Sequence, residues 1–269
     1  MGSDIIEYFQ NENQFLKTAH VKSIPIFLSQ LNLVPKFTIT IPTFNRPELL
    51  REALESGINQ TNFTDYEIIV VDNNPERDCD TEQLMSKYRN TNISYYKNSE
   101  NIGMFGNWNR CYELARSEWV CMLHDDDKLA TSYLNDLYKI IKSKSNIGFI
   151  SCRLQLLIQS DLKTSIYIMR KFKKCTREVL DVFLPKITKI KDTDYLFGFK
   201  TYIVGSCIKR EHAIDLGGFN STTFPSSDYY FTVKFQYEYN NIYFLKKKNY
   251  IYRILDNESM NPITSSKFI

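Results

Sequence analysis

Residues 119–127 read WVCMLHDDD, a short apolar run that ends in a histidine and three consecutive aspartates. An apolar run that stops at polar residues is typical of a buried strand. Three adjacent carboxylates repel one another, and a hard divalent cation bound through oxygen relieves that repulsion. The stretch therefore predicts a strand over Trp119–Leu123 followed by a metal-binding segment. If that segment is extended, Asp125 and Asp127 share one side and Asp126 faces the other.

The aspartates have a second explanation, a solvated turn with a helix cap, because aspartate is favoured in both places. Two upstream stretches weigh against it. Phe37–Ile41 (FTITI) is followed by the polar loop 42–47, and Tyr66–Val71 (YEIIVV) by Asp72 and two asparagines. Ligands of parallel sheets bind beyond the carboxyl ends of the strands. The three polar clusters are therefore expected to meet at one edge of one sheet.

The segments between and after these strands alternate in character. Helices are predicted at Glu48–Ile58, Thr81–Tyr88, Gly106–Arg116 and Ser132–Lys142, and further strands at Ile93–Lys97 and Ile147–Leu157. This alternation indicates an α/β fold with a mostly parallel central sheet flanked by helices. Residues 1–34 are predicted as an appended helical segment, helix-leaning from Gln14 to Leu31 except at Pro25. Residues 35–157 form the α/β part, and 158–269 a smaller part of the same compact domain.

Beyond residue 157 the pattern is weaker. Strands are predicted at Tyr202–Ile208 and Ile242–Leu245, helices at Lys209–Leu216 and Asp228–Tyr239, and a turn at Gly217–Phe219. Asp228 would begin its helix, where the macrodipole favours an acidic side chain. Spacing alone indicates no more than that for this residue.

Composition excludes several classes of protein. The 269 residues are 43% hydrophobic and 14% aromatic, which argues against disorder, and the net charge of +3 is too small to indicate nucleic-acid binding. The six cysteines form no CxxC pair, so the usual zinc spacings are missing and free thiols in a reducing compartment are expected. No signal peptide or membrane-spanning run is recognisable. We expect a cytoplasmic protein, or one peripheral at a membrane face.

Four stretches, in order, resemble the motifs of glycosyltransferase family 2: ITIPTFNRPELLREAL (39–54), EIIVVDNN (67–74), ENIGMFGNWNRCYELARSEWVCMLHDDD (100–127) and LGGFNSTTFPSSDYYFTVKF (216–235). The resemblance runs from about Phe37 to Tyr250. It implies the GT-A fold, in which a nucleotide-binding α/β half is fused to an acceptor-binding half. It also implies inverting transfer of one sugar, with a UDP-sugar as the expected donor. The Gln-x-x-Arg-Trp motif of processive relatives is missing, so polymer extrusion is not expected.

The resemblance also implies roles for single residues. Those implied to bind the nucleotide-sugar are Pro42, Thr43, Phe44, Asn45 and Arg46 around the base and ribose, Asp72 on the base, Asn101, Gly103 and Asn107 near the nucleotide, Asp125, and Arg253 toward the diphosphate. Asp126 is implied to be the direct ligand of Mn2+ or Mg2+, with Asp127 beside it. Asp228 matches the general base. Without the resemblance, Asp72 is equally well explained as a turn former.

The chain departs from the family at two of these places. His124 stands where the family often has aspartate, and Ser227 where it often has glutamate. For His124 we favour packing, or orientation of the neighbouring carboxylates, over a contact with phosphate.

A lipid-linked glycan is one acceptor that the sequence allows. The basic stretches Leu245–Tyr252 (LKKKNYIY) and Arg170–Lys174 either face water or lie against an anionic membrane or lipid-diphosphate acceptor, and solvated lysines are the commoner outcome. Two other functions stay open: a nucleotidyltransferase, although no glycine-rich loop follows the first strand, and a nucleotide-sugar- or glycan-binding module that has lost catalysis.

Overall fold

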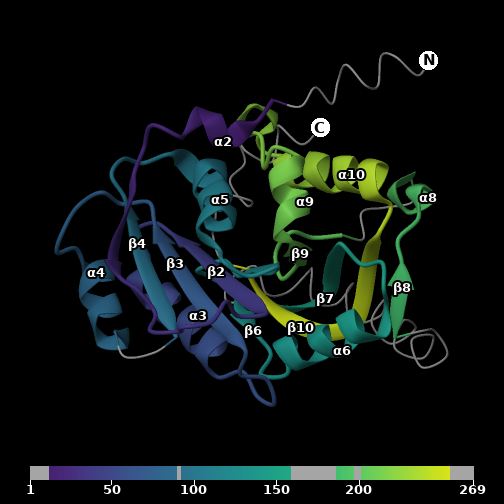
Figure 1. The fold of residues 1–269 in the computed structure, drawn as a ribbon, viewed down its shortest axis with the longest axis horizontal. Helices are drawn as coiled ribbons and strands as arrows, with labels where there is room; N and C mark the ends of the chain where they lie inside the picture. The colour runs from purple at the N-terminus through teal and green to yellow at the C-terminus, as the bar shows by residue number, and fades with distance from the viewer. Residues whose placement is uncertain (1–11, 90–91, 159–185, 197–200, 255–269) are drawn as a thin grey trace.

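The computed structural model describes residues 12–89, 92–158, 186–196 and 201–254. The predicted basic block Arg170–Lys174 lies outside these ranges. Within them, one sheet runs through the molecule with helices on both faces (Figure 1). Its strands are β1 (Ser23–Phe27), β2 (Phe37–Thr43), β3 (Tyr66–Asp72), β4 (Ile93–Asn98), β5 (Trp119–Met122), β6 (Lys128–Leu129), β7 (Phe149–Ile158), β8 (Ile187–Lys189), β9 (Cys207–Lys209) and β10 (Ile242–Ile254).

The strand order is β1-β4-β3-β2-β5-β9-β7-β10-β6, with β8 paired to β10. The block β4-β3-β2-β5 is parallel, as predicted, whereas β9 runs antiparallel to both of its neighbours. In the parallel block, Thr43 pairs with Asp72 at the ends of β2 and β3. The chain leaves β2 toward β3 on one side and reaches β5 on the other. The carboxyl ends of β2, β3 and β5 therefore form the ligand-binding edge expected of such sheets.

The helices are α2 (Gln14–Lys17), α3 (Pro47–Ile58), α4 (Asp80–Met85), α5 (Gly103–Leu114), α6 (Tyr133–Ser143), α8 (Asp192–Leu196), α9 (Arg210–Asp215) and α10 (Ser227–Tyr239), with 3-10 turns η1 (Ser86–Tyr88) and η2 (Ser221–Thr223). In Figure 1, α3 and α6 lie on one side of the sheet and α5, α9 and α10 on the other. None of the helices in the described ranges combines the length and apolar character needed to cross a bilayer.

Two hydrophobic cores occupy the two faces of the sheet, and β3 shows how the sequence builds them. Ile68 and Val70 belong to the core that includes α3 and α6. Ile69 and Val71 belong to the core that includes α5, α9 and α10. Successive side chains of a strand point to opposite faces, so a continuous apolar run is what a sheet covered on both sides requires.

Three predicted elements differ from the structure. Residues 23–27, predicted as part of a helical segment, form the edge strand β1, antiparallel to β4, while α2 is only four residues long. Pro25 has no N–H to donate, so an edge strand accommodates it and a helix interior does not.

The other two differences lie at the far end of the sheet. The strand predicted at Ile242–Leu245 continues to Ile254, because register shifts around Lys248 absorb the lysine-rich stretch. Within that stretch Lys247 and Lys248 are exposed, whereas Asn249 and Tyr250 are buried. The strand predicted at Tyr202–Ile208 is confined to Cys207–Lys209.

Candidate active site

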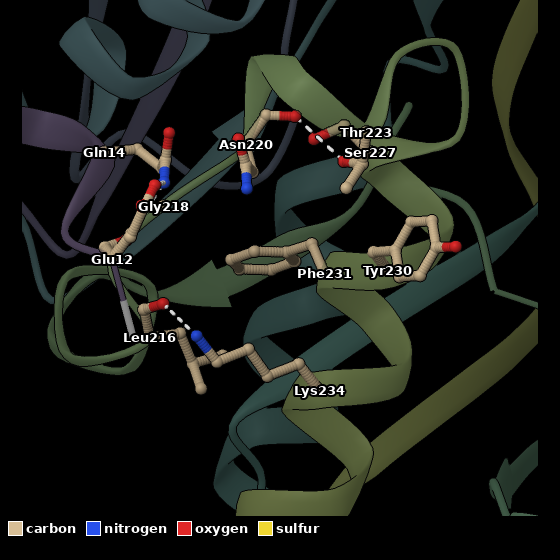
Figure 2. Close-up of a pocket in the computed structure, with 10 residues that line it drawn as sticks. All are labelled: Glu12, Gln14, Leu216, Gly218, Asn220, Thr223, Ser227, Tyr230, Phe231 and Lys234. Carbon is tan, nitrogen blue, oxygen red and sulfur yellow. Dashed lines mark hydrogen bonds between the residues drawn. The ribbon is translucent and has the colours of Figure 1, made fainter. Parts of the chain in front are cut away.

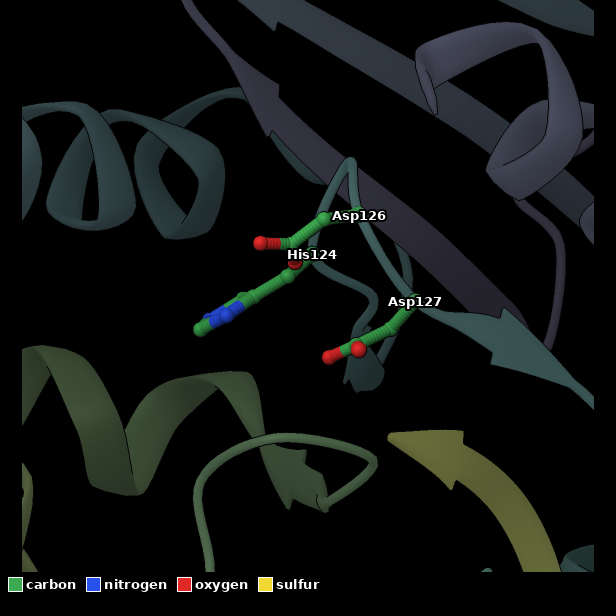
Figure 3. A group of neighbouring side chains, drawn as sticks. All are labelled: His124, Asp126 and Asp127. Carbon is green, nitrogen blue, oxygen red and sulfur yellow. The ribbon is translucent and has the colours of Figure 1, made fainter. Parts of the chain in front are cut away.

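The aspartates that follow β5 form a turn with His124, and residues 124–127 are called the acidic turn below. The N–H of Asp127 donates to the carbonyl of His124 at 3.2 Å. The segment is therefore not extended, so the alternation that would place Asp125 and Asp127 on one side does not apply. His124, Asp126 and Asp127 instead project to the same side (Figure 3), and one ligand atom from each lies within 4.8 Å of the others. We call these three the metal-ligand set.

Asp125 is directed at the loop after β2. Its Oδ2 accepts a hydrogen bond from the Thr43 hydroxyl at 2.8 Å. One guanidinium nitrogen of Arg46 lies 3.4 Å from Asp125 Oδ1 and 3.3 Å from Asp126 Oδ2. Burial raises the pKa of Asp125 to about 6, against the lowering effect of Arg46. The first and fourth strand ends of the prediction therefore meet as expected, joined through hydrogen bonds and an ion pair.

Asp127 is held by β10, from the far end of the chain. Its two oxygens accept from the hydroxyl of Tyr250 at 2.8 Å and from the backbone N–H of Arg253 at 2.7 Å. Burial, reinforced by the negative charge of Asp126, raises the pKa of Asp127 to about 7. A carboxyl group kept in such surroundings binds either a proton or a cation readily at neutral pH.

Arg253 fixes the turn from the same strand. Its Nε donates to the carbonyl of Asp126 at 2.8 Å, and its Nη2 pairs with Glu52 of α3 at 2.6 Å. The structure thus brings Arg253 to the acidic turn, and its buried guanidinium positions the backbone there. Its predicted contact with a diphosphate stays a prediction.

His124 carries a nitrogen that suits a metal better than packing alone. Its Nε2 is buried and has no hydrogen-bond partner among the described residues. The ring packs against Trp108 with centroids 4.7 Å apart. Burial lowers the pKa of His124, which favours the neutral imidazole that can bind a cation. An unpaired imidazole nitrogen beside two carboxylates fits the divalent metal that the sequence predicted.

Asp72 ends β3 at the same edge and is fully buried. Its Oδ2 accepts from Lys97 at 2.8 Å and from Tyr95 at 2.7 Å, while its Oδ1 accepts from the N–H of Asn74 at 2.9 Å. The last bond is the turn-forming role considered above. Lys97 and Tyr95 were not predicted, since a lysine inside an otherwise apolar strand gives no indication of its partner.

Asparagines position the loop before α5. Asn73 donates to Asn101 at 2.7 Å and accepts from Asn98 at 3.0 Å. Asn98 also donates to Asn107 at 2.9 Å. This network holds Gly103 in a left-handed conformation with φ of 73°. The predicted residues Asn101, Gly103 and Asn107 therefore lie next to the end of β3. There the side chains of the two asparagines hold the loop through hydrogen bonds.

The predicted loop after β2 is bonded to the loop that follows β3, beside the asparagine network. Asn45 adopts φ of 54° and accepts from Asn74 at 2.7 Å, so the loops after β2 and β3 are bonded to each other. Pro42 is buried in β2, whereas Phe44 is 44% exposed. An exposed aromatic ring at a ligand-binding edge is available to a ligand.

Asp228 lies in the first turn of α10 and belongs to neither of these hydrogen-bonded groups. Its Oδ1 accepts from the N–H of Tyr229 at 2.8 Å, and burial raises its pKa. Rings connect α10 to the acidic turn: Phe231 stacks on Phe219 at 4.4 Å, and Phe219 packs edge-on against Trp108 at 5.4 Å. Trp108 in turn contacts His124.

A small pocket lies beside the start of α10 (Figure 2). It is lined by Glu12, Gln14, Leu216, Gly218, Asn220, Thr223, Ser227, Tyr230, Phe231 and Lys234. Lys234 donates to the carbonyl of Leu216 at 2.7 Å. None of the residues predicted to bind the donor lines this pocket.

Comparison with known proteins agrees with this arrangement. Residues 38–207 match the family model "Glycosyl transferase family 2". A GalNAc(5)-diNAcBac-PP-undecaprenol beta-1,3-glucosyltransferase of Campylobacter jejuni is 36% identical over 117 residues, 43% of this chain and 36% of that protein. The poly(ribitol-phosphate) beta-N-acetylglucosaminyltransferase TarP of Staphylococcus aureus is 31% identical over 41% of this chain and 34% of that protein. The matched region thus spans about a third of these relatives.

Solved structures show the same fold. Staphylococcus aureus TarS in complex with UDP-GlcNAc has a TM-score of 0.65 and 20% identity, covering 84% of this chain and 61% of that one. A mannosyltransferase of Pyrobaculum calidifontis in complex with GDP-Man and Mn2+ has a TM-score of 0.56 and 18% identity, covering 94% and 65%. The α/β fold of GT-A type expected from the motifs is confirmed. With the family model covering most of the chain, this protein belongs to glycosyltransferase family 2.

Proposed function

We propose that this protein is an inverting glycosyltransferase that moves one sugar from a nucleotide-diphosphate sugar to an acceptor hydroxyl. The observation that carries the proposal is the acidic turn after β5, where the metal-ligand set gathers at the carboxyl edge of the parallel block. That edge combines carboxylates for a cation with a polar loop for a nucleoside, which is what a donor site needs.

The proposed donor is a UDP-sugar. Asp72 would accept a hydrogen bond from a ring N–H of the base. A carboxylate has about four acceptor positions, and three of those of Asp72 are taken by Tyr95, Lys97 and Asn74. Because Asp72 is fully buried, the remaining position would reach the base only when the side chains that cover it move. The complex of TarS with UDP-GlcNAc supports this choice of donor class, although hexose and N-acetylhexosamine donors are equally compatible with the site.

Asp126 and Asp127 are proposed to hold Mn2+ or Mg2+. When bound, the cation supplies Lewis-acid stabilisation of the charge that develops on the leaving diphosphate. Arg46 is proposed to add a second positive charge, since its side chain is 44% exposed and lies beside Asp125 and Asp126. Asp125, bonded to Thr43, keeps the loop after β2 close to the position of the ribose.

Asp228 is proposed to remove the proton from the acceptor hydroxyl. Burial raises its pKa, and a carboxylate with a raised pKa is a stronger general base. Attack by the deprotonating hydroxyl from the side opposite the diphosphate inverts the anomeric centre. The aromatic contacts that join α10 to Trp108 hold this helix in a fixed relation to the acidic turn.

The proposed acceptor is a glycan, and a lipid-linked glycan is the first candidate. The printed name of the Campylobacter relative describes a glycan on a lipid diphosphate. Such an acceptor would place the protein at the cytoplasmic face of a membrane as a peripheral protein. The exposed Lys247 and Lys248 of β10 offer positive charge for that contact, although Lys247 already pairs with Asp136 at 2.6 Å.

The direct test incubates the protein with UDP-glucose or UDP-N-acetylglucosamine, Mn2+ and a short glycan on a polyprenyl diphosphate, and weighs the acceptor by mass spectrometry. Addition of one sugar, with the opposite anomeric configuration by NMR, supports the proposal and resolves the donor class. Addition of a nucleoside monophosphate would show a nucleotidyltransferase. Binding of the donor, with neither transfer of its sugar to a glycan acceptor nor hydrolysis of the donor, would favour a binding module.

A further inference from the structure

His124 is held in place by contacts of both its ring and its backbone, although one nitrogen of the ring has no hydrogen-bond partner among the described residues. Its ring is held against Trp108, which is itself buried. Its backbone N–H donates to the hydroxyl of Tyr250 at 3.2 Å, and that hydroxyl in turn donates to Asp127. Through Tyr250, His124 and Asp127 are therefore held in one fixed arrangement. Its Nε2 is buried and unpaired among the described residues.

The ligand atoms of the metal-ligand set lie almost as close together as a shared cation requires. Ligands at about 2.1 Å from an octahedral ion lie roughly 3 to 4.2 Å from one another. The ligand atoms of His124, Asp126 and Asp127 lie within 4.8 Å of one another, so a small inward movement closes the site. Figure 3 shows the three side chains directed to the same side of the turn.

A nitrogen ligand changes which metal such a site prefers. Mg2+ binds oxygen and dehydrates reluctantly, whereas Mn2+, although it also favours oxygen ligands, accepts an imidazole nitrogen more readily than Mg2+ does. We propose that His124 is a direct nitrogen ligand of the cation and that it makes the site prefer Mn2+ to Mg2+. This inference rests on the proposed use of a metal by this turn, but it does not depend on the donor or the acceptor.

Packing alone would not explain His124 as well. A histidine that serves only as a wall for Trp108 gains nothing from burying an unpaired nitrogen, because an unmade hydrogen bond in the interior is costly. A phenylalanine would pack there without that cost.

Pulsed EPR on the Mn2+-loaded protein tests the assignment without any enzymatic readout. Echo-envelope modulation reports nitrogen bound to Mn2+, and labelling with 15N-histidine identifies it as imidazole. The wild type and His20→Asn, a change at an exposed histidine, should show this coupling. His124→Phe, which preserves packing on Trp108, should lose it and bind Mn2+ about tenfold more weakly.

The variant His124→Asp places an oxygen ligand at the same position. It should bind Mn2+ without nitrogen coupling, and its preference for Mn2+ over Mg2+ should fall about tenfold relative to wild type. Thermal unfolding of each variant checks that the fold persists.

The inference would be overturned by Mn2+-loaded wild type without nitrogen coupling, by coupling that survives in folded His124→Phe, or by a folded wild type that binds no Mn2+ at millimolar concentration. Coupling in a protein that binds no nucleotide would retain the inference and contradict the proposed function. Mn2+-dependent UDP binding without nitrogen coupling would overturn the inference and retain the proposed function.

Discussion

The three aspartates of the acidic turn are adjacent in the chain but lie in different surroundings. Asp125 accepts from Thr43, Asp126 faces Arg46, and Asp127 accepts from Tyr250 and a backbone N–H. Only Asp126 and Asp127 gather with His124. The residue types could be read from the sequence, but not this division of labour, because it depends on a turn and on partners from β2 and β10.

Protonation of Asp127 should leave a measurable trace in the stability of the metal-free protein. Its pKa is raised from 3.8 to about 7, so the folded state holds a proton that the unfolded state releases. The stability this provides is present below about pH 4 and is lost as pH rises through 7. In EDTA, Asp127→Asn should therefore gain stability relative to wild type between pH 5 and pH 8, on the order of 1–3 kcal/mol.

Urea unfolding of both proteins at several pH values measures this difference. His124 and His212, whose pKa values are lowered by burial, change the free energy of unfolding with pH in the opposite direction. Their contribution is common to both proteins and cancels when the stability of the wild type is subtracted from that of the variant. A stability difference that does not change between pH 5 and pH 8 would show that Asp127 has an ordinary pKa.

Asp228 is the residue on which the chemical step is proposed to depend. Asp228→Asn should lower the rate of sugar transfer about a hundred- to ten-thousand-fold, because the amide cannot accept a proton. Donor affinity should be unchanged, since the side chain is bonded to the backbone of α10 and not to the residues proposed to bind the donor. Transfer kinetics and calorimetric titration of the donor give the two readouts, and Ser226→Ala, two residues earlier, is a matched control. Normal turnover by Asp228→Asn would end its assignment as the base.

At the level of elements, β10 carries more of the site than its sequence indicated. Tyr250 and Arg253 reach Asp127 from more than 120 positions away in the chain. The run of lysines hides the continuation of this strand from any alternation pattern, and no local signal links Tyr250 to the acidic turn. By contrast, β2, β3, β5, α3 and α5 were predictable, since their apolar periodicity is regular and each strand ends in polar residues.

The backbone beneath Tyr250 should be intolerant of substitution. Gly205 has φ of 69°, and a Cβ there would overlap the Tyr250 ring. Gly205→Ala should cost about 2–5 kcal/mol of stability and weaken Mn2+ binding, because Tyr250 must move away from Asp127. Gly103→Ala is the matched control: its φ is 73°, but nothing lies within 4 Å of the added Cβ. It should cost only about 1–2 kcal/mol.

Urea unfolding and Mn2+ titration of the two glycine variants separate steric overlap from backbone strain. Equal losses of stability in both variants would show that strain alone matters. Unchanged Mn2+ affinity in Gly205→Ala would show that Tyr250 does not position the acidic turn.

At the scale of the whole molecule, one sheet joins the predicted α/β part, residues 35–157, to strands from the part that follows it. The parallel block supplies the strand ends, and β9, β7 and β10 extend the same sheet and return the chain to the acidic turn. Fold class and the meeting of three polar strand ends followed from alternation of strands and helices. Edge strand β1 did not, since a short segment with a proline resembles a broken helix as much as a strand.

The central claim is that this edge binds a nucleotide through a divalent cation held by the acidic turn. Calorimetric titration of UDP, GDP, CDP and dTDP, with and without Mn2+, tests it most directly, with UDP repeated on Asp126→Ala and on Asp65→Ala, a carboxylate outside the turn. We predict selective, Mn2+-dependent binding of UDP that Asp126→Ala weakens at least tenfold and Asp65→Ala leaves intact. A folded wild-type protein that binds no nucleotide with Mn2+ present, or binds UDP equally well in Asp126→Ala, would contradict the account.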